Sequence, residues 1–354
     1  VNLLVGKNAT GKTRTLSVIK GLADLLSGES RLRFRSGNFN ATFDDDGKSE
    51  NYVLTYSDSK VIREEFTFDG NRVLTRGDGG AGKIFAEKEE KEIEFQTPEN
   101  ELAAVARRDK LQHSFFEPLH QWASSLYHYA FALDLGKAAF VVVTKNHGSQ
   151  VNSRDTEQVV AIFRKGEKDL GDPFKEAIRK DMAAVGYSLD DVGTGPCVSV
   201  IIEGPFPSEP VAIFVKETSL RSNTDQTEMS QGMFRALSLI IQTTYSEMAG
   251  QPSCILIDDI GEGLDFERSC ALIKLLTDKA KRSSVQLVMA TNDRFVMNNV
   301  PLEAWSLLRR EGTECRVYNY ANSKAIFDEF KFTGMNNFDF FALDFVREEQ
   351  PVNE

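Results

Sequence analysis

The chain has 354 residues, of which 41% are hydrophobic and 27% are charged, and its formal net charge is −11 at pH 7. These values are ordinary for a soluble globular protein, and they argue against a disordered chain or a surface that is basic throughout. No stretch approaches the ~18 consecutive apolar residues of a membrane span. We therefore expect a cytoplasmic protein that uses no membrane partner.

Residues 1–14 combine a short apolar run with a glycine-rich loop. The loop, Gly6-Lys7-Asn8-Ala9-Thr10-Gly11-Lys12-Thr13, satisfies the pattern GxxxxGK[ST] at every constrained position, and Arg14 follows it. In such a loop, backbone N–H groups surround phosphate oxygens, Lys12 reaches the β- and γ-phosphates, and Thr13 holds magnesium. The loop therefore predicts a site for ATP and Mg²⁺. Since Val1 already belongs to the expected first strand, we expect the natural chain to begin earlier.

Apolar spacing predicts a helix over residues 12–27, and the next segment alternates in the manner of strands. Short alternating runs separated by glycine-rich turns predict an antiparallel β layer within residues 31–97, with strands at 31–35, 52–56, 64–68 and 93–95. The charge-mixed run 87–94 favours a solvated strand edge over a docking site.

Helical spacing dominates the middle of the chain. We expect helices within residues 99–135 and at 156–170 and 173–186, followed by a β-hairpin of 198–203 and 211–217. His113 and His120 would lie about 10 Å apart along one helix, which is too far for one metal ion, and His128 adds no ligand spacing. Cys197, Cys254, Cys270 and Cys315 are scattered without a CxxC pair, so we expect free thiols and no zinc site.

From about residue 229 helices and strands alternate as in a parallel sheet. Met229-Ser230-Gln231-Gly232-Met233-Phe234-Arg235 places a serine hydroxyl and a glycine N–H at the start of a helix, which suits an anion. The apolar strand 254–257 then ends in Asp258 and Asp259, and Gly261 to Asp265 follow. A further apolar strand, 285–289, leads to Asn292.

These four motifs in this order resemble ATP-binding-cassette (ABC) ATPases. Their form is similar to the overcoming-lysogenization-defect (OLD) proteins and to stand-alone bacterial antiphage-defence ATPases, which are SMC-like ABC heads without a coiled coil. The resemblance implies an α/β P-loop fold with a mixed core sheet, an antiparallel β layer and an inserted helical lobe. Residues 1–354 would form one head, with about 1–98 and 211–354 in the nucleotide-binding core and about 99–210 in the helical lobe.

The resemblance also implies roles for individual residues. Asp258 would hold magnesium, Asp259 would orient the attacking water, and Gln96 is the candidate for the magnesium-binding glutamine. Ser230, Gln231, Gly232 and Asp265 would contact the nucleotide held by another subunit, so ATP would join a head-to-tail dimer or a higher oligomer.

Two residues depart from the family pattern. Asp259 stands where glutamate is usual and is one methylene shorter, so we expect the water to be held less well. Asn292 stands where a switch histidine is usual, and its amide can hydrogen-bond a γ-phosphate without changing charge near neutral pH. Both departures favour slow or partner-dependent hydrolysis and leave ATP binding intact.

The resemblance favours an ATP-dependent switch or scaffold that serves a separate effector, a nuclease or a toxin, in antiphage defence. About 40 residues follow Arg310, which is too few for a fused nuclease domain. The alternative is a DNA-repair or recombination ATPase acting directly on DNA. It would use the alternating Arg31, Arg33 and Arg35 or the pairs 107–108 and 309–310, and nucleic acid stays open as a partner.

Seven phenylalanines lie between residues 327 and 345. Packing against the sheet is the favoured interpretation, and a partner-docking surface is the alternative.

Overall fold

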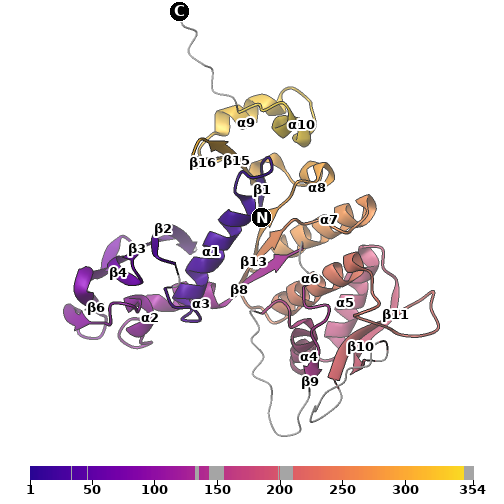
Figure 1. Ribbon diagram of the computed structural model, residues 1–354, viewed down its shortest axis with the longest axis horizontal. Coiled ribbons are helices and arrows are strands. Elements are labelled where there is room, and N and C mark those ends of the chain that lie inside the picture. Colours follow the sequence, from indigo (N-terminus) through magenta and orange to yellow (C-terminus); the bar gives the residue numbers. More distant parts are fainter. Residues whose placement is uncertain are drawn as a thin grey trace, which may run out of the picture. The chain divides into compact units, whose positions relative to one another are not determined.

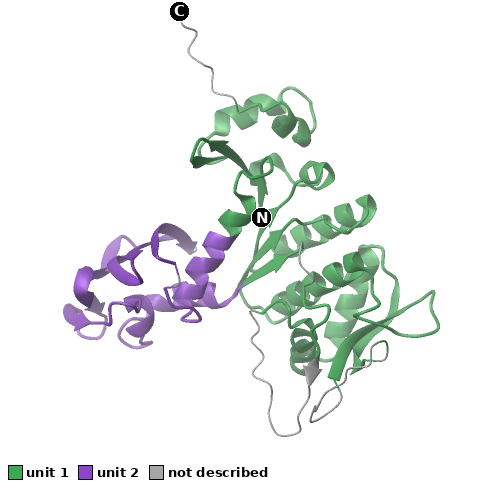
Figure 2. Cartoon of the chain, viewed as in Figure 1, with its two compact units in different colours: residues 1–16, 127–354 green, residues 17–126 purple. Residues whose placement is uncertain are grey.

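The computed structural model describes residues 1–32, 34–45, 47–131, 135–142, 155–197, 199 and 210–346. The chain divides into two compact units, one of residues 1–16 and 127–354 and the other of residues 17–126 (Figure 2). This division differs from the lobes expected from the sequence. The antiparallel β layer lies in the smaller unit, and the helices after residue 155 lie with the nucleotide-binding motifs.

A six-stranded sheet forms the core of the larger unit, in the order β16-β15-β1-β14-β13-β8. Strand β1 is parallel to both β14 and β15, and β13 is parallel to β14, so the ends of these strands meet at one edge. The strands are β1 (Asn2–Val5), β8 (Leu126–Ala130), β13 (Ser253–Asp258), β14 (Val285–Ala290), β15 (Trp305–Glu311) and β16 (Glu314–Asn319). This arrangement confirms the mixed α/β core.

Strand β8 corrects one expectation, because its residues fall within the segment 99–135 that was expected to be helical. The structure forms only two short helices there, α2 (Ala103–Ala106) and α3 (Phe116–Ser124). The sequence Leu-Tyr-His-Tyr-Ala then alternates between more and less buried positions, and tyrosine favours strands. His128 therefore lies on a strand, and no cluster of three potential metal ligands occurs among the described residues.

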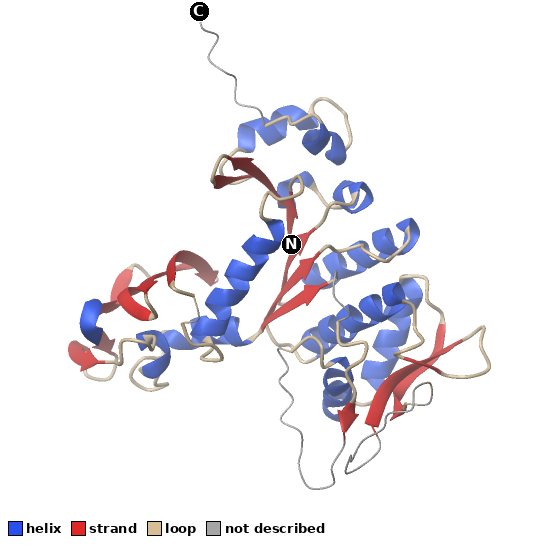
Figure 3. Ribbon diagram, in the orientation of Figure 1, coloured by secondary structure: helices blue, strands red, loops and turns tan. Residues whose placement is uncertain are grey.

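Helices pack around this sheet in the larger unit (Figure 1, Figure 3). Helices α4, α5 and α6 contact one another, and α7 contacts both α5 and α6. The helices are α4 (Val159–Leu170), α5 (Asp172–Ala184), α6 (Gln231–Met248), α7 (Phe266–Arg282), α8 (Arg294–Asn299), η2 (Leu302–Ala304), α9 (Lys324–Lys331) and α10 (Asn337–Ala342). Among the described residues, no helix is long and apolar enough to cross a membrane.

A small sheet lies beside these helices, with β10 (Leu189–Pro196) antiparallel to β11 (Pro210–Glu217). Strand β12 (Thr224–Asp225) and strand β9 (Val141–Val142) complete it. The expected hairpin thus keeps its second arm, but the strand that pairs with it is β10. Most of the expected first arm, 198–203, lies outside the described residues.

The smaller unit contains a second six-stranded sheet, in which every strand pairs antiparallel with the next along the chain. Its elements are β2 (Ser36–Asp45), β3 (Lys48–Ser57), β4 (Lys60–Phe68), β5 (Asn71–Arg76), η1 (Asp78–Gly80), β6 (Ala81–Ala86) and β7 (Lys91–Gln96). The antiparallel layer is therefore confirmed, with the charged run at an edge strand. Arg31 and Arg35 precede β2, so the expected strand of alternating arginines is wrong.

The C-terminal phenylalanines pack mainly into the core. Phe327, Phe330 and Phe340 are buried, and the Phe340 ring contacts Trp305 of β15 edge-on at 6.4 Å. Phe332 is the exception, with 91% of its surface exposed. The core-packing interpretation is confirmed for the three buried rings. The four cysteines are free thiols.

Candidate nucleotide site

The P-loop joins β1 to helix α1 (Lys12–Leu26), and its backbone has the tight curvature that its sequence predicts. Ala9 and Gly11 have φ angles of 64° and 104°, which lie in the region that favours glycine. Gly6 has no room for a side chain, because a Cβ there would lie 2.8 Å from the carbonyl oxygen of Leu308. Thr10 closes the turn, since its hydroxyl donates a 2.9 Å hydrogen bond to the Lys7 carbonyl oxygen. The loop is preformed.

Lys12 brings two distant motifs together. Its buried Nζ donates to the carbonyl oxygen of Gly6 at 2.7 Å and to Asn292 Oδ1 at 2.7 Å. Asn292 follows β14, so the parallel pairing of β1 with β14 places the two residues at one sheet edge. Burial lowers the pKa of Lys12, while Asp259 and Asp258 act in the opposite direction. A phosphate at this loop would give the ammonium group a stronger partner than a carbonyl.

The two carboxylates at the end of β13 have different surroundings. Asp258 is buried, and its Oδ1 has no hydrogen-bond partner among the described residues. A buried carboxylate oxygen without a partner is costly, and a hard cation such as Mg²⁺ would satisfy it. Asp259 is in the left-handed region at φ 54°. Burial, together with the charges of Asp258 and Glu262, raises the pKa of Asp259, which suits a group that accepts a proton.

The other residues predicted to contact ATP or Mg²⁺ bound to their own chain have fewer described contacts. Lys7, Asn8 and Ala9 are exposed on the loop, and Thr13 and Arg14 are exposed in the first turn of α1. Gln96 ends β7 in the smaller unit, and its side-chain amide donates to the carbonyl oxygen of Gly79 at 2.6 Å. Its role as a magnesium ligand stays a prediction.

Residues 229–235 contain the pattern SxGxxR, which resembles the signature motif of ABC ATPases. This signature segment packs against the loop that follows β13. Ser230 is the N-cap of α6, and its Oγ accepts a hydrogen bond from the Met233 N–H at 3.2 Å. Gly232 is buried against Gly263, and a Cβ at position 232 would lie 2.3 Å from the Gly263 carbonyl oxygen. Arg235 donates to the carbonyl oxygen of Glu262 at 2.9 Å. Glycine and arginine of the SxGxxR pattern therefore hold the signature segment against this loop.

Asp265 begins α7 as its N-cap, accepting from the Arg268 N–H at 2.9 Å, and its other oxygen pairs with Arg268 Nη1 at 2.8 Å. These hydrogen bonds lower the pKa of Asp265. Ser230, Gln231 and Asp265 are all exposed. A cavity of about 630 Å³ lies beside Ser230, and Tyr187 and Arg268 also line it. Sequence reasoning missed both of these residues, because neither belongs to a recognisable motif.

The structure thus separates the predicted residues into two sets. Lys12 contacts Asn292 and is close enough to Asp258 and Asp259 for their charges to affect its pKa, which forms one set. Ser230 and Gly232 form the other, and the described residues that line the cavity at Ser230 include none from the P-loop. The first set has the groups that hold a nucleotide triphosphate and its metal, and the second presents hydroxyl and N–H groups to an anion.

Residues 1–298 match the protein family described as "AAA domain, putative AbiEii toxin, Type IV TA system". No curated protein matches the chain significantly. Among solved structures, an SMC head bound to the C-winged helix domain of ScpA is 14% identical, with a TM-score of 0.51 over 92% of this chain and 91% of that one. The SMC head domain from Thermotoga maritima is 13% identical, with a TM-score of 0.44 over 90% and 89%.

The likeness to the first of these structures confirms the fold expected from the motifs, that of an SMC-type ABC ATPase head. The family match covers both the P-loop and Asn292. The chain therefore belongs to the AAA family described above.

Proposed function

We propose that the protein binds MgATP between two subunits and hydrolyses it slowly. The observation that carries this proposal is a pair of groups at one sheet edge: the buried Asp258 oxygen without a partner, and the Lys12 ammonium, whose hydrogen-bond partners among the described residues are only the neutral carbonyl and amide oxygens of Gly6, Lys7 and Asn292. Both groups gain a better partner when magnesium and a triphosphate are present.

The chain's own residues then have separate tasks. The N–H groups of the P-loop and Lys12 hold the β- and γ-phosphates, and Thr13 and Asp258 are the residues that would hold magnesium, which supplies charge neutralisation. Asp259 orients the attacking water and accepts its proton, consistent with its raised pKa. Asn292 offers its amide to the γ-phosphate but cannot take a proton. Turnover is slow for this reason and because Asp259 is short.

The dimer follows from the separation of the two sets of residues. None of the described residues that line the cavity at Ser230 belongs to the P-loop. The signature segment therefore contacts a nucleotide that is bound to the P-loop of a second subunit. Ser230, Asp265 and Phe266 are exposed, which leaves this surface open to a partner. A head-to-tail pair with two equivalent sites satisfies both halves.

We propose further that this dimer is a switch or scaffold for a separate effector protein, a nuclease or a toxin, in antiphage defence. The resemblance of the motifs to OLD-like and defence ATPases supports this role, and the family description names a putative toxin of a type IV TA system. The alternative, an ATPase acting directly on DNA, has less support, because Arg31 and Arg35 do not lie on a strand. A steep salt dependence of DNA binding would favour it.

A mixing experiment tests the composite site. Neither Lys12→Ala nor Ser230→Arg alone should turn over ATP, because each lacks one half of every site. In an equal mixture half of the dimers contain both variants, and each mixed dimer keeps one intact site, so turnover should return to about a quarter of wild type. A mixture as inactive as its components would contradict the head-to-tail arrangement.

A second experiment tests hydrolysis. Asp259→Asn should abolish turnover while MgATP-dependent dimers accumulate, as measured by sedimentation. Unchanged turnover in this variant would contradict the role given to Asp259, and a mass that does not respond to MgATP would contradict the nucleotide-dependent dimer.

A further inference from the structure

The cavity beside Ser230 contains a cation that the motifs do not predict. Arg268 lies in the first turn of α7, and it is the one lysine or arginine among the described residues that line this cavity. Ser230 and Met233 line it from α6, and Tyr187 lines it from the loop between α5 and β10. The Ser230 hydroxyl, the start of α6 and the Arg268 guanidinium therefore line the same cavity.

Tyr187 orients the arginine beside the serine. It lines the same cavity as Ser230, and the centre of its ring lies 4.4 Å from Arg268 Cζ in a cation–π contact. Asp265 holds the opposite side of the guanidinium through Nη1. Arg268 is therefore oriented from two directions, although its side chain is 39% exposed.

The hydrogen-bonding capacity of Arg268 is not used up. Its guanidinium has five N–H donors: Nε is buried without a partner, Nη1 donates to Asp265, and Nη2 makes no hydrogen bond among the described residues, so Nη2 is the group that a partner's phosphate would meet. An oriented guanidinium with unused donors matches the planar oxygens of a phosphate group. Glu217 and Glu228 also line the cavity, so an anion without a cation beside it would be repelled there.

Resting on the head-to-tail dimer proposed above, we propose that Arg268 is a catalytic residue supplied in trans. Together with Ser230 it contacts the γ-phosphate of the ATP that is bound to the partner's P-loop. Tyr187 is a positioning residue that holds the guanidinium beside Ser230. A guanidinium at this position stabilises the charge that develops on the transferred phosphoryl group as water attacks.

The test uses a subunit that can act only in trans. A Lys12→Ala chain cannot hold ATP in its own P-loop, so in a mixed dimer with wild type it contributes only its Ser230 and Arg268. Wild type is assayed with an excess of Lys12→Ala, of Lys12→Ala/Arg268→Gln or of Lys12→Ala/Lys274→Gln. Lys274 is exposed on the same helix α7, and its replacement removes the same charge.

We expect the Lys12→Ala chain and the Lys12→Ala/Lys274→Gln chain to support turnover at the wild-type P-loop. We expect the Arg268→Gln chain to reduce it by at least about tenfold, since arginines supplied in trans to phosphoryl transfer contribute 10³ or more. Equal support from all three chains would overturn the proposal, because the wild-type subunit still has its own Arg268. A role of Arg268 at the P-loop of its own chain would give that same result.

Sedimentation in MgATP separates the two proposals. If wild type does not dimerise, the proposed function fails and this inference fails with it. If the mixed dimers form and the Arg268→Gln chain supports turnover fully, the inference alone fails. Circular dichroism and the melting temperature of Lys12→Ala/Arg268→Gln show whether the donor chain is folded. If that chain is unfolded, Lys12→Ala/Arg268→Lys replaces it: reduced turnover supports the proposal, and full support of turnover overturns it.

Discussion

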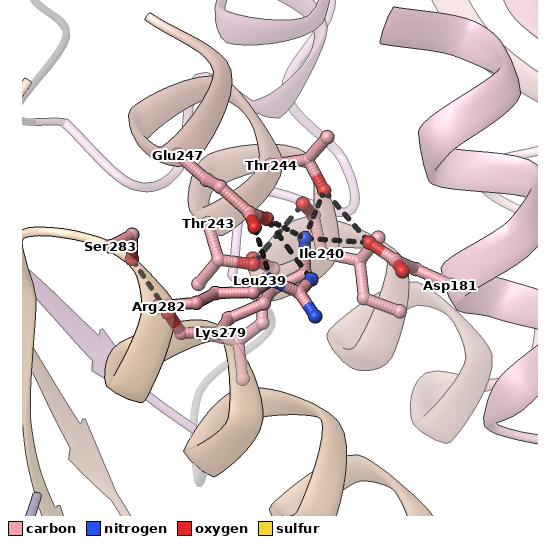
Figure 4. Close-up of polar contacts among 9 residues, drawn as sticks. All are labelled: Asp181, Leu239, Ile240, Thr243, Thr244, Glu247, Lys279, Arg282 and Ser283. Atoms are coloured by element: carbon pink, nitrogen blue, oxygen red, sulfur yellow. Dashed lines mark hydrogen bonds and ion pairs between the residues drawn. The ribbon is translucent and has the colours of Figure 1, made fainter. Parts of the chain in front are cut away.

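Replacing Lys279 by methionine tests how helices α6 and α7 are held. The starts of these helices carry Ser230 and Arg268, the residues of the proposed trans surface. Lys279 is 2% exposed on α7, and its Nζ lies 2.7 Å from Asp181 Oδ2 on α5 and 2.7 Å from Glu247 Oε2 on α6 (Figure 4). It also donates to Thr244 Oγ1 at 3.1 Å. One ammonium group therefore joins three helices. Methionine fills a similar volume but leaves two carboxylates without their shared cation.

The expected cost follows from the exposure of these carboxylates. Breaking a buried ion pair by removing one partner costs about 3–5 kcal/mol, because the remaining charge is left uncompensated. The Asp181 and Glu247 side chains are 11% and 21% exposed, and Arg282 still pairs with Glu247 at 2.5 Å. We therefore expect the lower end of this range, about 3 kcal/mol. Arg282→Gln is the matched control and should cost less than about 1 kcal/mol, since Arg282 is 54% exposed.

The assay needs a fluorescence signal that comes only from the larger unit. The chain has two tryptophans, Trp122 in the smaller unit and Trp305 in the core sheet of the larger one. In a Trp122→Phe background, urea unfolding followed by fluorescence reports the larger unit. A loss below about 1 kcal/mol for Lys279→Met, no larger than that for Arg282→Gln, would refute the reasoning.

The pH dependence gives a second readout of the same cluster. Burial opposes ionisation of Glu247, but hydrogen bonds from Arg282 and Lys279 outweigh it and lower the pKa of Glu247. A carboxyl group with a lowered folded-state pKa stabilises the protein above its ordinary pKa of about 4.3 and loses this effect as the pH falls through the folded value. The difference between wild type and Lys279→Met should therefore be largest near neutral pH and shrink below about pH 4.3.

Three further predictions concern the other parts of the chain. Gly232→Ala should cost about 1–3 kcal/mol and prevent MgATP-dependent dimers, because its Cβ would lie 2.3 Å from the Gly263 carbonyl oxygen; an unchanged melting temperature and dimer mass would contradict this. Asn292→Ala should retain ATP binding but lose about 10²-fold in turnover, through loss of one amide donor to the γ-phosphate; equal kcat values would refute that role. Glu64→Gln should destabilise the smaller unit by about 3 kcal/mol, because the fully buried Glu64 pairs with buried Arg76 at 3.3 Å; the fluorescence of the tryptophan in that unit measures it.

The sequence pointed to Lys12, Asp258 and Asn292 because each belongs to a short segment with a recognisable pattern. The glycine spacing around Lys12 determines a local backbone path, and the apolar run before Asp258 determines a buried strand. Parallel pairing then brings their ends to one edge, so Lys12 meets Asn292 although 280 residues separate them. Local patterns and one topological rule were sufficient.

The same reasoning failed where contact with a distant segment of the same chain determines the local structure. Residues 126–130 have apolar side chains that also continue a helical spacing, and the choice of strand depends on the free edge of β13, which the sequence does not reveal. Tyr187 and Arg268 are likewise brought together by packing between a loop and α7. Their residue types carry no signal at that spacing, so the cationic part of the trans surface could not be predicted.

The trans surface depends on two helices that are fastened at both ends. Ser230 is the N-cap of α6 and Asp265 is the N-cap of α7, and near these helix starts Gly232 is in close contact with Gly263. Seventeen residues after Ser230, about 26 Å along α6, Glu247 is joined to α7 by the buried Lys279. A displacement of Ser230 relative to Arg268 would have to break one of these contacts. Because the backbone contact and the ion pair oppose such a displacement from both ends, Ser230 and Arg268 keep a fixed spacing. In the proposed dimer a nucleotide on the partner would meet this preorganised pair, as charge stabilisation in a transition state requires.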